Sequence, residues 1–184
     1  MDYVDLYLIH WPGSWGKNES YSQAKKRRQD TWRAMELVYE SGKAKAIGVS
    51  NFMPSHLEDL VETASVKPMV NQFEFNAFQQ NESVLLACRE FGIVPQGYSP
   101  LAKAYNLENS TLLKVAKAKQ ATPAQILLRW SLQKEVPIIP KTTKPERVKE
   151  NLGCFNFSLD KFEMELLDSL DSNMHVTWDP TNVV

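Results

Sequence analysis

The segment 141–149 concentrates positive charge in a chain whose charges are otherwise balanced. Its charged residues are one acid and four bases, namely Glu146, Lys141, Lys144, Arg147 and Lys149. The pattern Thr143–Glu146 is that of a helix capping box, so we expect the bases at a helix start, where backbone amides and the helix dipole favour an anion. The segment therefore predicts a phosphate site, against the alternative that a basic helix start is simply solvated.

Other polar residues stand at or just after the ends of five short apolar runs. The runs cover residues 3–9, 46–49, 69–73, 93–97 and 136–139, and the polar residues are His10, Ser50, Asn51, Gln72, Glu74, Tyr98, Ser99, Lys141, Thr142 and Thr143. We interpret the runs as buried β-strands, because their hydrophobicity does not alternate. A random scatter of polar residues would not follow strand ends so consistently. We therefore expect these side chains to converge at the carboxyl ends of parallel strands, as in an α/β barrel.

Stretches with helical periodicity separate the runs. Apolar stripes at helical spacing begin at Trp32, Leu57 and Val84, and Thr122–Gln125 forms a capping box with proline at the first helical position. Strand–helix–strand connections make neighbouring strands parallel, so the sequence predicts the α/β class. We expect residues 1–184 to form a single domain. No glycine-rich turn of the usual dinucleotide-binding kind follows any run.

The composition limits the class of protein further. There are 21 basic and 22 acidic residues, and the resulting net charge of −1 argues against a nucleic-acid partner. The apolar runs are far shorter than the roughly 20 residues that cross a bilayer, and the start of the chain lacks the bases of a signal peptide. We expect a cytoplasmic protein without a membrane partner. Cys88 and Cys154 have no metal-ligand spacing and are expected in the core, and residues 25–28 are expected to form a solvated basic helix face.

Five motifs, in order along the chain, resemble those of the aldo-keto reductases. They are DLYLIHWP at 5–12, GVSNF at 48–52, NQFEFN at 71–76, GYSPL at 97–101 and IPKTTKPERVKEN at 139–151. This family builds (β/α)8 barrels that reduce carbonyl compounds with NADPH. The resemblance covers nearly the whole chain and implies an incomplete TIM-type barrel of about five parallel strands. These would be strands 4 to 8, in a truncated barrel whose N-terminal part is absent.

The resemblance also implies roles for single residues at the reacting end of the cofactor. His10 matches the catalytic histidine that orients the substrate carbonyl, whereas by spacing alone it is a hydrogen-bonded structural residue. Trp11 would line the substrate pocket. Further matches to the family concern the nicotinamide. Its carboxamide would be held by Ser50, Asn51 and Gln72. Its ring would stack on the ring of Tyr98. Without the family, Ser50 and Asn51 have the alternative of simple turn chemistry.

The remaining matches concern the other end of the cofactor. Ser99 and Leu101 would lie along the pyrophosphate. The family's contacts to the adenosine 2′-phosphate match Lys141, Thr142 and Arg147. Its contacts to the adenine match Glu150 and Asn151. An arginine fork beside a lysine suits a phosphate dianion, which favours NADPH over NADH. No metal site is implied.

Two functions remain open at this stage. The resemblance implies an NADPH-dependent oxidoreductase that reduces small aldehydes or ketones to alcohols, yet no residue here matches the family's catalytic aspartate, tyrosine and lysine. The alternative is a catalytically inactive cofactor-binding or regulatory half-barrel. An open barrel would also expose two sheet edges, so self-association through them is expected.

Overall fold

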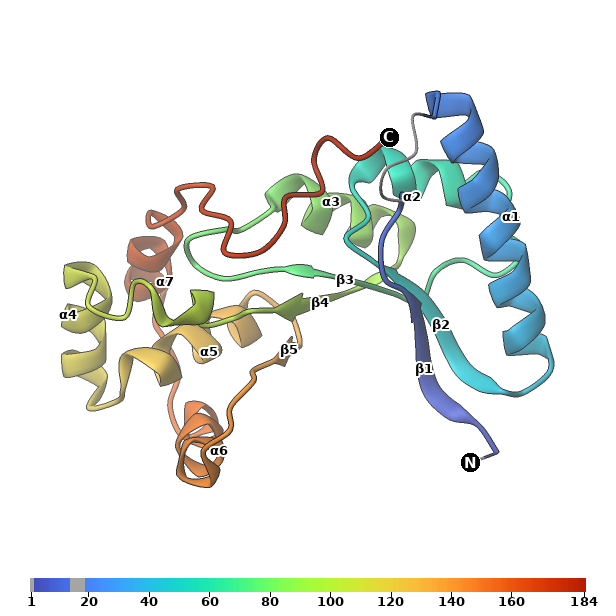
Figure 1. The fold of residues 1–184 in the computed structure, drawn as a ribbon. Helices are drawn as coiled ribbons and strands as arrows, with labels where there is room; N and C mark the ends of the chain where they lie inside the picture. Colours follow the sequence, from blue (N-terminus) through green and yellow to red (C-terminus); the bar gives the residue numbers. More distant parts are fainter. Residues whose placement is uncertain (1, 14–18) are drawn as a thin grey trace. The chain divides into compact units, whose positions relative to one another are not determined.

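The computed structural model describes residues 2–13 and 19–184 and has the α/β architecture that the sequence predicts (Figure 1). One sheet contains, in spatial order, β1 (Val4–Ile9), β2 (Ala44–Ser50), β3 (Val70–Glu74), β4 (Val94–Tyr98) and β5 (Ile138–Ile139). The pairs β1–β2, β2–β3 and β4–β5 are parallel. Each strand overlaps one of the five apolar runs. The prediction of an incomplete barrel of about five parallel strands is confirmed.

Helices connect the strands. They are α1 (Tyr21–Glu40), α2 (Pro54–Val61), α3 (Glu82–Phe91), α4 (Ser110–Lys119), α5 (Pro123–Gln133), α6 (Pro145–Leu152) and α7 (Lys161–Asp168), with short 3-10 turns η1 (Ala102–Ala104) and η2 (Gly153–Phe155). The capping box predicted for α5 is present. Thr122 Oγ1 accepts a hydrogen bond from the Gln125 amide at 3.3 Å, and Gln125 Oε1 accepts one from the Thr122 amide at 2.9 Å.

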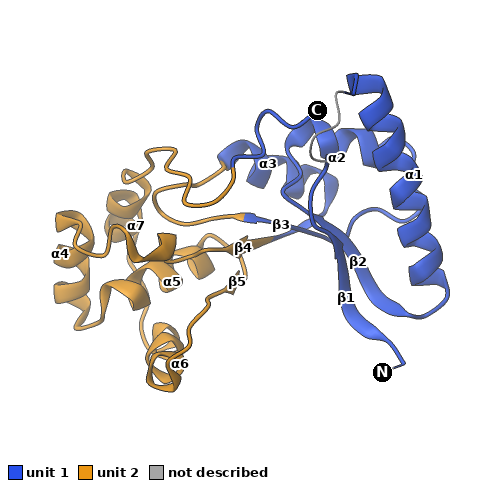
Figure 2. Ribbon diagram, viewed as in Figure 1, with its two compact units in different colours: residues 1–73, 82–95, 179–184 blue, residues 74–81, 96–178 orange. Residues whose placement is uncertain are grey.

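The chain forms two compact units (Figure 2). Unit 1 contains residues up to 73 together with 82–95 and 179–184, and unit 2 contains 74–81 and 96–178. In unit 1, α1 packs against α2 and β2 around the buried Trp32. In unit 2, α5 packs against α4, α6 and β5, and its Trp130 ring stacks on Phe75 with 5.1 Å between centroids. Cys88 and Cys154 are both buried, as expected.

The expectation that residues 25–28 form a solvated face is wrong for Arg28. This arginine is 3% exposed, and its Nη2 lies 2.7 Å from Asp59 Oδ2. The reason is helical spacing: Arg28 falls on the buried stripe of α1 between Ala24 and Trp32. Burial alone would raise the pKa of Asp59, but hydrogen bonds from Arg28, Tyr21 and Lys25 outweigh it and lower that pKa.

The predicted capping box at Thr143–Glu146 is also wrong. Helix α6 begins at Pro145, and Lys144 is its N-cap with φ −107° and ψ 115°. A residue before proline is pushed out of the helical region, so Lys144 cannot start a helix capped by Thr143. The hydroxyl of Thr142 supplies the local bond instead, accepting from the Lys144 amide at 3.1 Å.

The first and last strands carry exposed apolar side chains. Val4 and Tyr7 on β1 are 38% and 49% exposed, and Ile139 on β5 is 44% exposed. β5 is only two residues long because Pro137 and Pro140, which lack a backbone N–H, flank it. Self-association through these edges stays a prediction. Within the described ranges, no helix is long and apolar enough to cross a membrane.

Stability is expected to depend on pH through His56, which is 2% exposed in α2. Met53 N–H donates to Nδ1 at 3.1 Å, so the proton lies on Nε2, which donates to the Val183 carbonyl at 2.9 Å. Burial lowers the pKa of this imidazole. A neutral ring is therefore favoured in the fold, and its stabilisation is present above the ordinary histidine pKa of about 6.5 and lost as the pH falls below that value.

Urea unfolding between pH 7.5 and 5.5 measures this effect. We expect the free energy of unfolding to fall on acidification by at most about 1.4 kcal/mol per pH unit for this one proton. His56→Gln should remove that part of the slope, whereas His10→Gln, which changes an exposed histidine, should keep it. An unchanged slope in His56→Gln would contradict the assignment.

Candidate functional site

In unit 1, the strand register aligns the ends of β1, β2 and β3. Ile9 pairs with Val49, and Ser50 pairs with Gln72. Because parallel strands end at the same edge of a sheet, this register brings the residues that follow each strand together. His10, Ser50, Asn51 and Gln72 are thus neighbours, as the sequence predicts.

Hydrogen bonds lock these strand ends to one another. Ser50 Oγ donates to the Gln72 carbonyl at 2.7 Å, and Asn51 Nδ2 donates to the His10 carbonyl at 3.0 Å. Asn51 is 2% exposed and has φ +62°, a left-handed conformation that asparagine tolerates better than most residues. Both bonds run between separate strand ends rather than within a turn, and they hold the histidine-bearing strand end in place.

His10 and Trp11 leave β1 side by side. The His10 ring is exposed, and its centroid lies 6.0 Å from that of Trp11. Trp11 lines a pocket of about 190 Å³ in unit 1, together with Ile9, Pro12, Gly13, Arg27, Arg28, Thr31 and Phe52. An exposed imidazole at a strand end is able to donate a hydrogen bond to a carbonyl oxygen of a bound molecule.

In unit 2, β4 ends in a tight turn that carries the GYSPL motif. Ser99 has φ +50°, and its carbonyl accepts from the Ala102 amide at 2.9 Å. The Leu101 carbonyl accepts from the Ala104 amide at 2.7 Å. These bonds form a tight turn directly after Tyr98, and the turn contains Ser99 and Leu101.

The Tyr98 hydroxyl lies inside unit 2, 3.1 Å from Thr177 Oγ1. Burial raises the pKa of this phenol, so it keeps its proton at neutral pH. The Thr177 hydroxyl in turn lies 2.5 Å from the buried carboxylate of Glu74. The strand-end pattern of polar residues includes Glu74, but it does not predict the hydrogen bond of Glu74 to Thr177. Thr177 has no signal in the sequence, because it belongs to a segment without periodicity.

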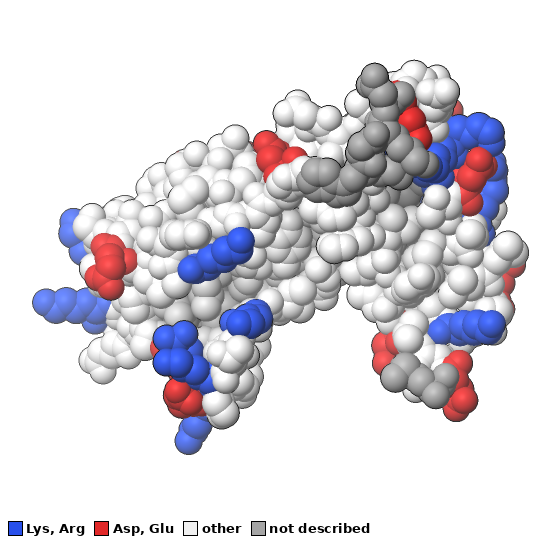
Figure 3. Space-filling model, in the orientation of Figure 1, with Lys and Arg blue, Asp and Glu red and all other residues white. Residues whose placement is uncertain are grey.

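The segment 141–151 presents its charges outward. Four basic side chains are exposed and, within the part of the chain that the structure describes, make no ion pair: Lys141, Lys144, Arg147 and Lys149. Figure 3 shows lysine and arginine gathered over α6 and the segment before it. Glu150 is tied to α5 by a bond of 2.7 Å from Gln125 Nε2 to its carbonyl. Cations without internal partners are available to an external anion.

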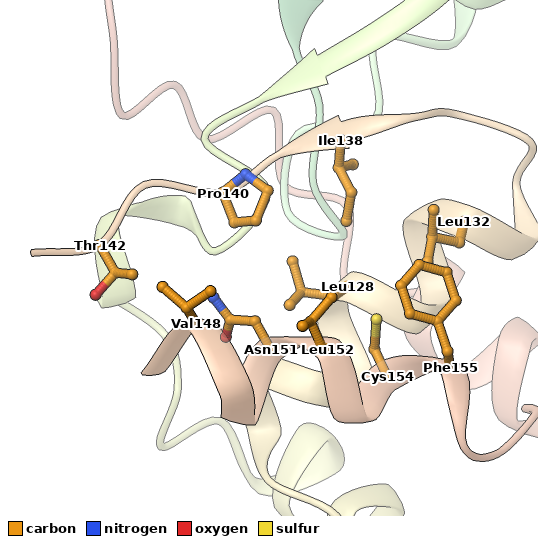
Figure 4. A pocket seen from close by; sticks show the side chains of 10 residues that line it. All are labelled: Leu128, Leu132, Ile138, Pro140, Thr142, Val148, Asn151, Leu152, Cys154 and Phe155. Carbon is orange, nitrogen blue, oxygen red and sulfur yellow. The ribbon is translucent and has the colours of Figure 1, made fainter. Parts of the chain in front are cut away.

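A pocket of about 240 Å³ lies between β5, α5, α6 and η2 (Figure 4). Its apolar lining is Leu128, Leu132, Ile138, Pro140, Val148, Leu152, Cys154 and Phe155, and its polar members are Thr142 and Asn151. The Asn151 side chain points into the space beneath Pro140. Two of the residues predicted to contact the adenosine part of a cofactor are therefore in one pocket. No cluster of metal-ligating side chains occurs among the described residues.

Comparison with known proteins places this arrangement in a family. The family model described as the aldo/keto reductase family matches residues 1–172. The chain is 40% identical over 184 residues to the glyoxal reductase of Bacillus subtilis, covering 100% of this chain and 63% of that protein. The chain spans about three-fifths of the length of the curated relatives that it matches.

Solved structures agree with the sequence comparison. An aldo-keto reductase from a Medee basin deep-sea metagenome library matches with a TM-score of 0.87 and 38% identity, covering 100% of this chain and 66% of that one. A mutant of Gox0644 in complex with NADPH matches with a TM-score of 0.88 and 34% identity, over 100% of this chain and 65% of the other. The motifs, the strand order and the matched residues together show that the chain belongs to the aldo/keto reductase family.

Proposed function

We propose that the chain binds NADPH and takes part in the reduction of small aldehydes or ketones. The observation that carries this proposal is the basic segment of unit 2, whose four exposed cations have no internal ion-pair partner in the described residues. The relative of known structure with NADPH bound supports the choice of cofactor. Bound NADPH would supply a hydride.

The donor set of the basic segment fits a phosphate dianion. Arg147 offers a planar fork of N–H groups, and Lys141 adds a compact point charge. The first turn of α6 contributes few amides, because Pro145 has no N–H and the Arg147 amide donates to the Lys144 carbonyl at 3.1 Å, so the side chains carry this assignment. We assign the 2′-phosphate to Lys141, Thr142 and Arg147, and the pyrophosphate to Ser99 and Leu101.

The pocket beside α6 suits a purine. The adenine ring has an apolar face and a polar edge, and the pocket has an apolar wall with one amide side chain. We therefore assign an adenine contact to Asn151, and we assign a second to Glu150, outside the pocket lining, on the family resemblance alone. Val148 and Pro140, which line the same pocket, would contact the face of the ring.

We assign the nicotinamide to residues at or near strand ends. Ser50, Asn51 and Gln72 carry the donors and acceptors that a carboxamide requires. Tyr98 is assigned the stacking role, and its hydroxyl lies 3.1 Å from Thr177 Oγ1. His10 would orient the substrate carbonyl, and Trp11 would contact the substrate.

A second candidate function is cofactor binding without turnover. Reduction of a carbonyl needs a proton as well as a hydride, and a positioned general acid typically contributes about 10²–10⁴-fold to such a step. Tyr98 is not assigned this role, because it belongs to the GYSPL stacking motif and its hydroxyl lies 3.1 Å from Thr177 Oγ1. A regulatory or cofactor-binding protein would need only the anion site and the stacking ring.

Arg147→Ala tests the phosphate assignment. Loss of a charge-assisted hydrogen bond typically costs about 1.5–3 kcal/mol, so the Kd for NADPH should rise about tenfold or more. The Kd for NADH, which lacks the 2′-phosphate, should stay within about twofold. Nucleotide fluorescence titrations measure both constants. Arg89→Ala, an exposed arginine on α3, is the matched control. Equal weakening of NADH and NADPH would disprove the assignment.

His10→Ala tests the proposed chemistry. With a reactive aldehyde, we expect the chain to oxidise NADPH, and the variant should be slower by about 10²-fold or more if His10 assists proton delivery. Absorbance at the nicotinamide band follows the reaction. An NADPH titration of the same variant separates lost chemistry from lost binding. Binding by the unmodified chain with no oxidation at all would favour the second candidate function.

A further inference from the structure

The buried carboxylate of Glu74 fastens the segment 172–177 within unit 2. Glu74 is 3% exposed at the end of β3. Its oxygens accept hydrogen bonds from the Val176 amide at 2.9 Å, the Thr177 amide at 3.2 Å and the Thr177 hydroxyl at 2.5 Å. A carboxylate in the interior needs several donors, and this segment supplies three of them.

Further bonds fasten the same segment along residues 74–79. The amides of Ser172 and Met174 both donate to the Phe78 carbonyl at 3.1 Å. Gln79 Nε2 lies 3.2 Å from both Asn173 Oδ1 and His175 Nε2. The segment is therefore held at several successive residues, and Thr177 has a fixed position relative to Glu74.

The chemistry of the groups determines the direction of the bond between Tyr98 and Thr177. An ionised carboxylate only accepts hydrogen bonds, so the single hydroxyl proton of Thr177 points to Glu74. The Thr177 oxygen is then available to Tyr98 only as an acceptor. The phenol must therefore donate to it across their 3.1 Å separation. The result is a directed chain from Tyr98 through Thr177 to Glu74.

We propose that Thr177 is a positioning residue for the stacking ring, because its hydroxyl ties the Tyr98 phenol to the carboxylate of Glu74. The tyrosine ring can rotate about two side-chain torsions when only its Cβ is fixed. A hydrogen bond at its hydroxyl restricts this rotation and holds the ring in one plane. Holding that plane before the cofactor arrives lowers the entropy cost of stacking. This inference rests on the proposed function, which assigns the nicotinamide to Tyr98.

Thr177→Val tests the inference, since it keeps the side-chain shape and removes the hydroxyl. The probes are NADPH, which would use both the ring and the basic segment, and adenosine 2′,5′-bisphosphate, which would use the basic segment alone. We expect Thr177→Val to weaken NADPH binding about three- to tenfold, the range of one ordinary hydrogen bond, and to leave bisphosphate binding within about twofold. Thr177→Ser, which restores the hydroxyl, should recover NADPH binding.

A double-mutant cycle with Tyr98→Phe shows whether the effect passes through the phenol. Tyr98→Phe keeps the ring and removes its hydroxyl, so each single change should break the same chain. The Kd of the double variant for NADPH should then lie within about twofold of the Kd of either single variant. Thr111→Val on α4 is the matched control and should bind both probes as the unmodified chain does.

The possible outcomes separate this inference from the function on which it rests. If the unmodified chain binds both probes but Thr177→Val weakens them equally, or weakens neither, the positioning role is overturned and the proposed cofactor site stands. Additive effects of the two substitutions would overturn it as well. If the unmodified chain binds neither probe, the proposed function fails, and the positioning role fails with it.

Discussion

Parallel strand register is the constraint on which the candidate site depends. Ser50 stands opposite Gln72, and in the other unit Tyr98 stands opposite Ile139, so residues distant in sequence end at common edges. The spacing between β2 and β3 requires glycine at position 48. A Cβ there would lie 2.4 Å from the Val70 carbonyl oxygen, which no side chain could avoid. One missing side chain thus sets how closely two functional strand ends approach.

Several buried charged groups among the described residues are paired with the backbone or with an opposite charge. Arg28 meets Asp59, and the Glu36 carboxylate accepts from the Val66 amide at 2.8 Å. The free-energy cost of burying an unpaired charge is much larger than the net stabilisation that such pairs give to the fold. Their value is therefore positional: they determine where α1 and the loops after α2 lie. Glu74 follows the same rule in unit 2, where its partner is the segment that carries Thr177.

The sequence predicted the strands and most helices, because these follow from local periodicity. It also predicted that His10, Ser50 and Gln72 meet at one edge of unit 1, because parallel strands share that edge. It failed where the deciding interaction was not local. Helical spacing does place Arg28 on a buried stripe, but a charged side chain is normally predicted to be exposed. Only the structure shows that Asp59, on another helix, pairs with it. The start of α6 was a different failure, since the effect of Pro145 on Lys144 was available from the sequence alone. No residue pattern indicated the bond between Thr177 and Tyr98.

The polar residues of the candidate site divide into two physical kinds. The side chains of Ser50, Asn51 and Tyr98 form hydrogen bonds with other groups of the protein, and these bonds hold their positions. The bases of segment 141–149 are exposed, so they contribute attraction to an anion. Attraction at a remote phosphate is equal in the ground and transition states and gives affinity without rate. Rate requires groups that are held in place near the reacting atoms. On the proposed function, the basic segment would give the chain its affinity for the cofactor, whereas the chemistry would depend on how well a few strand-end side chains are fixed.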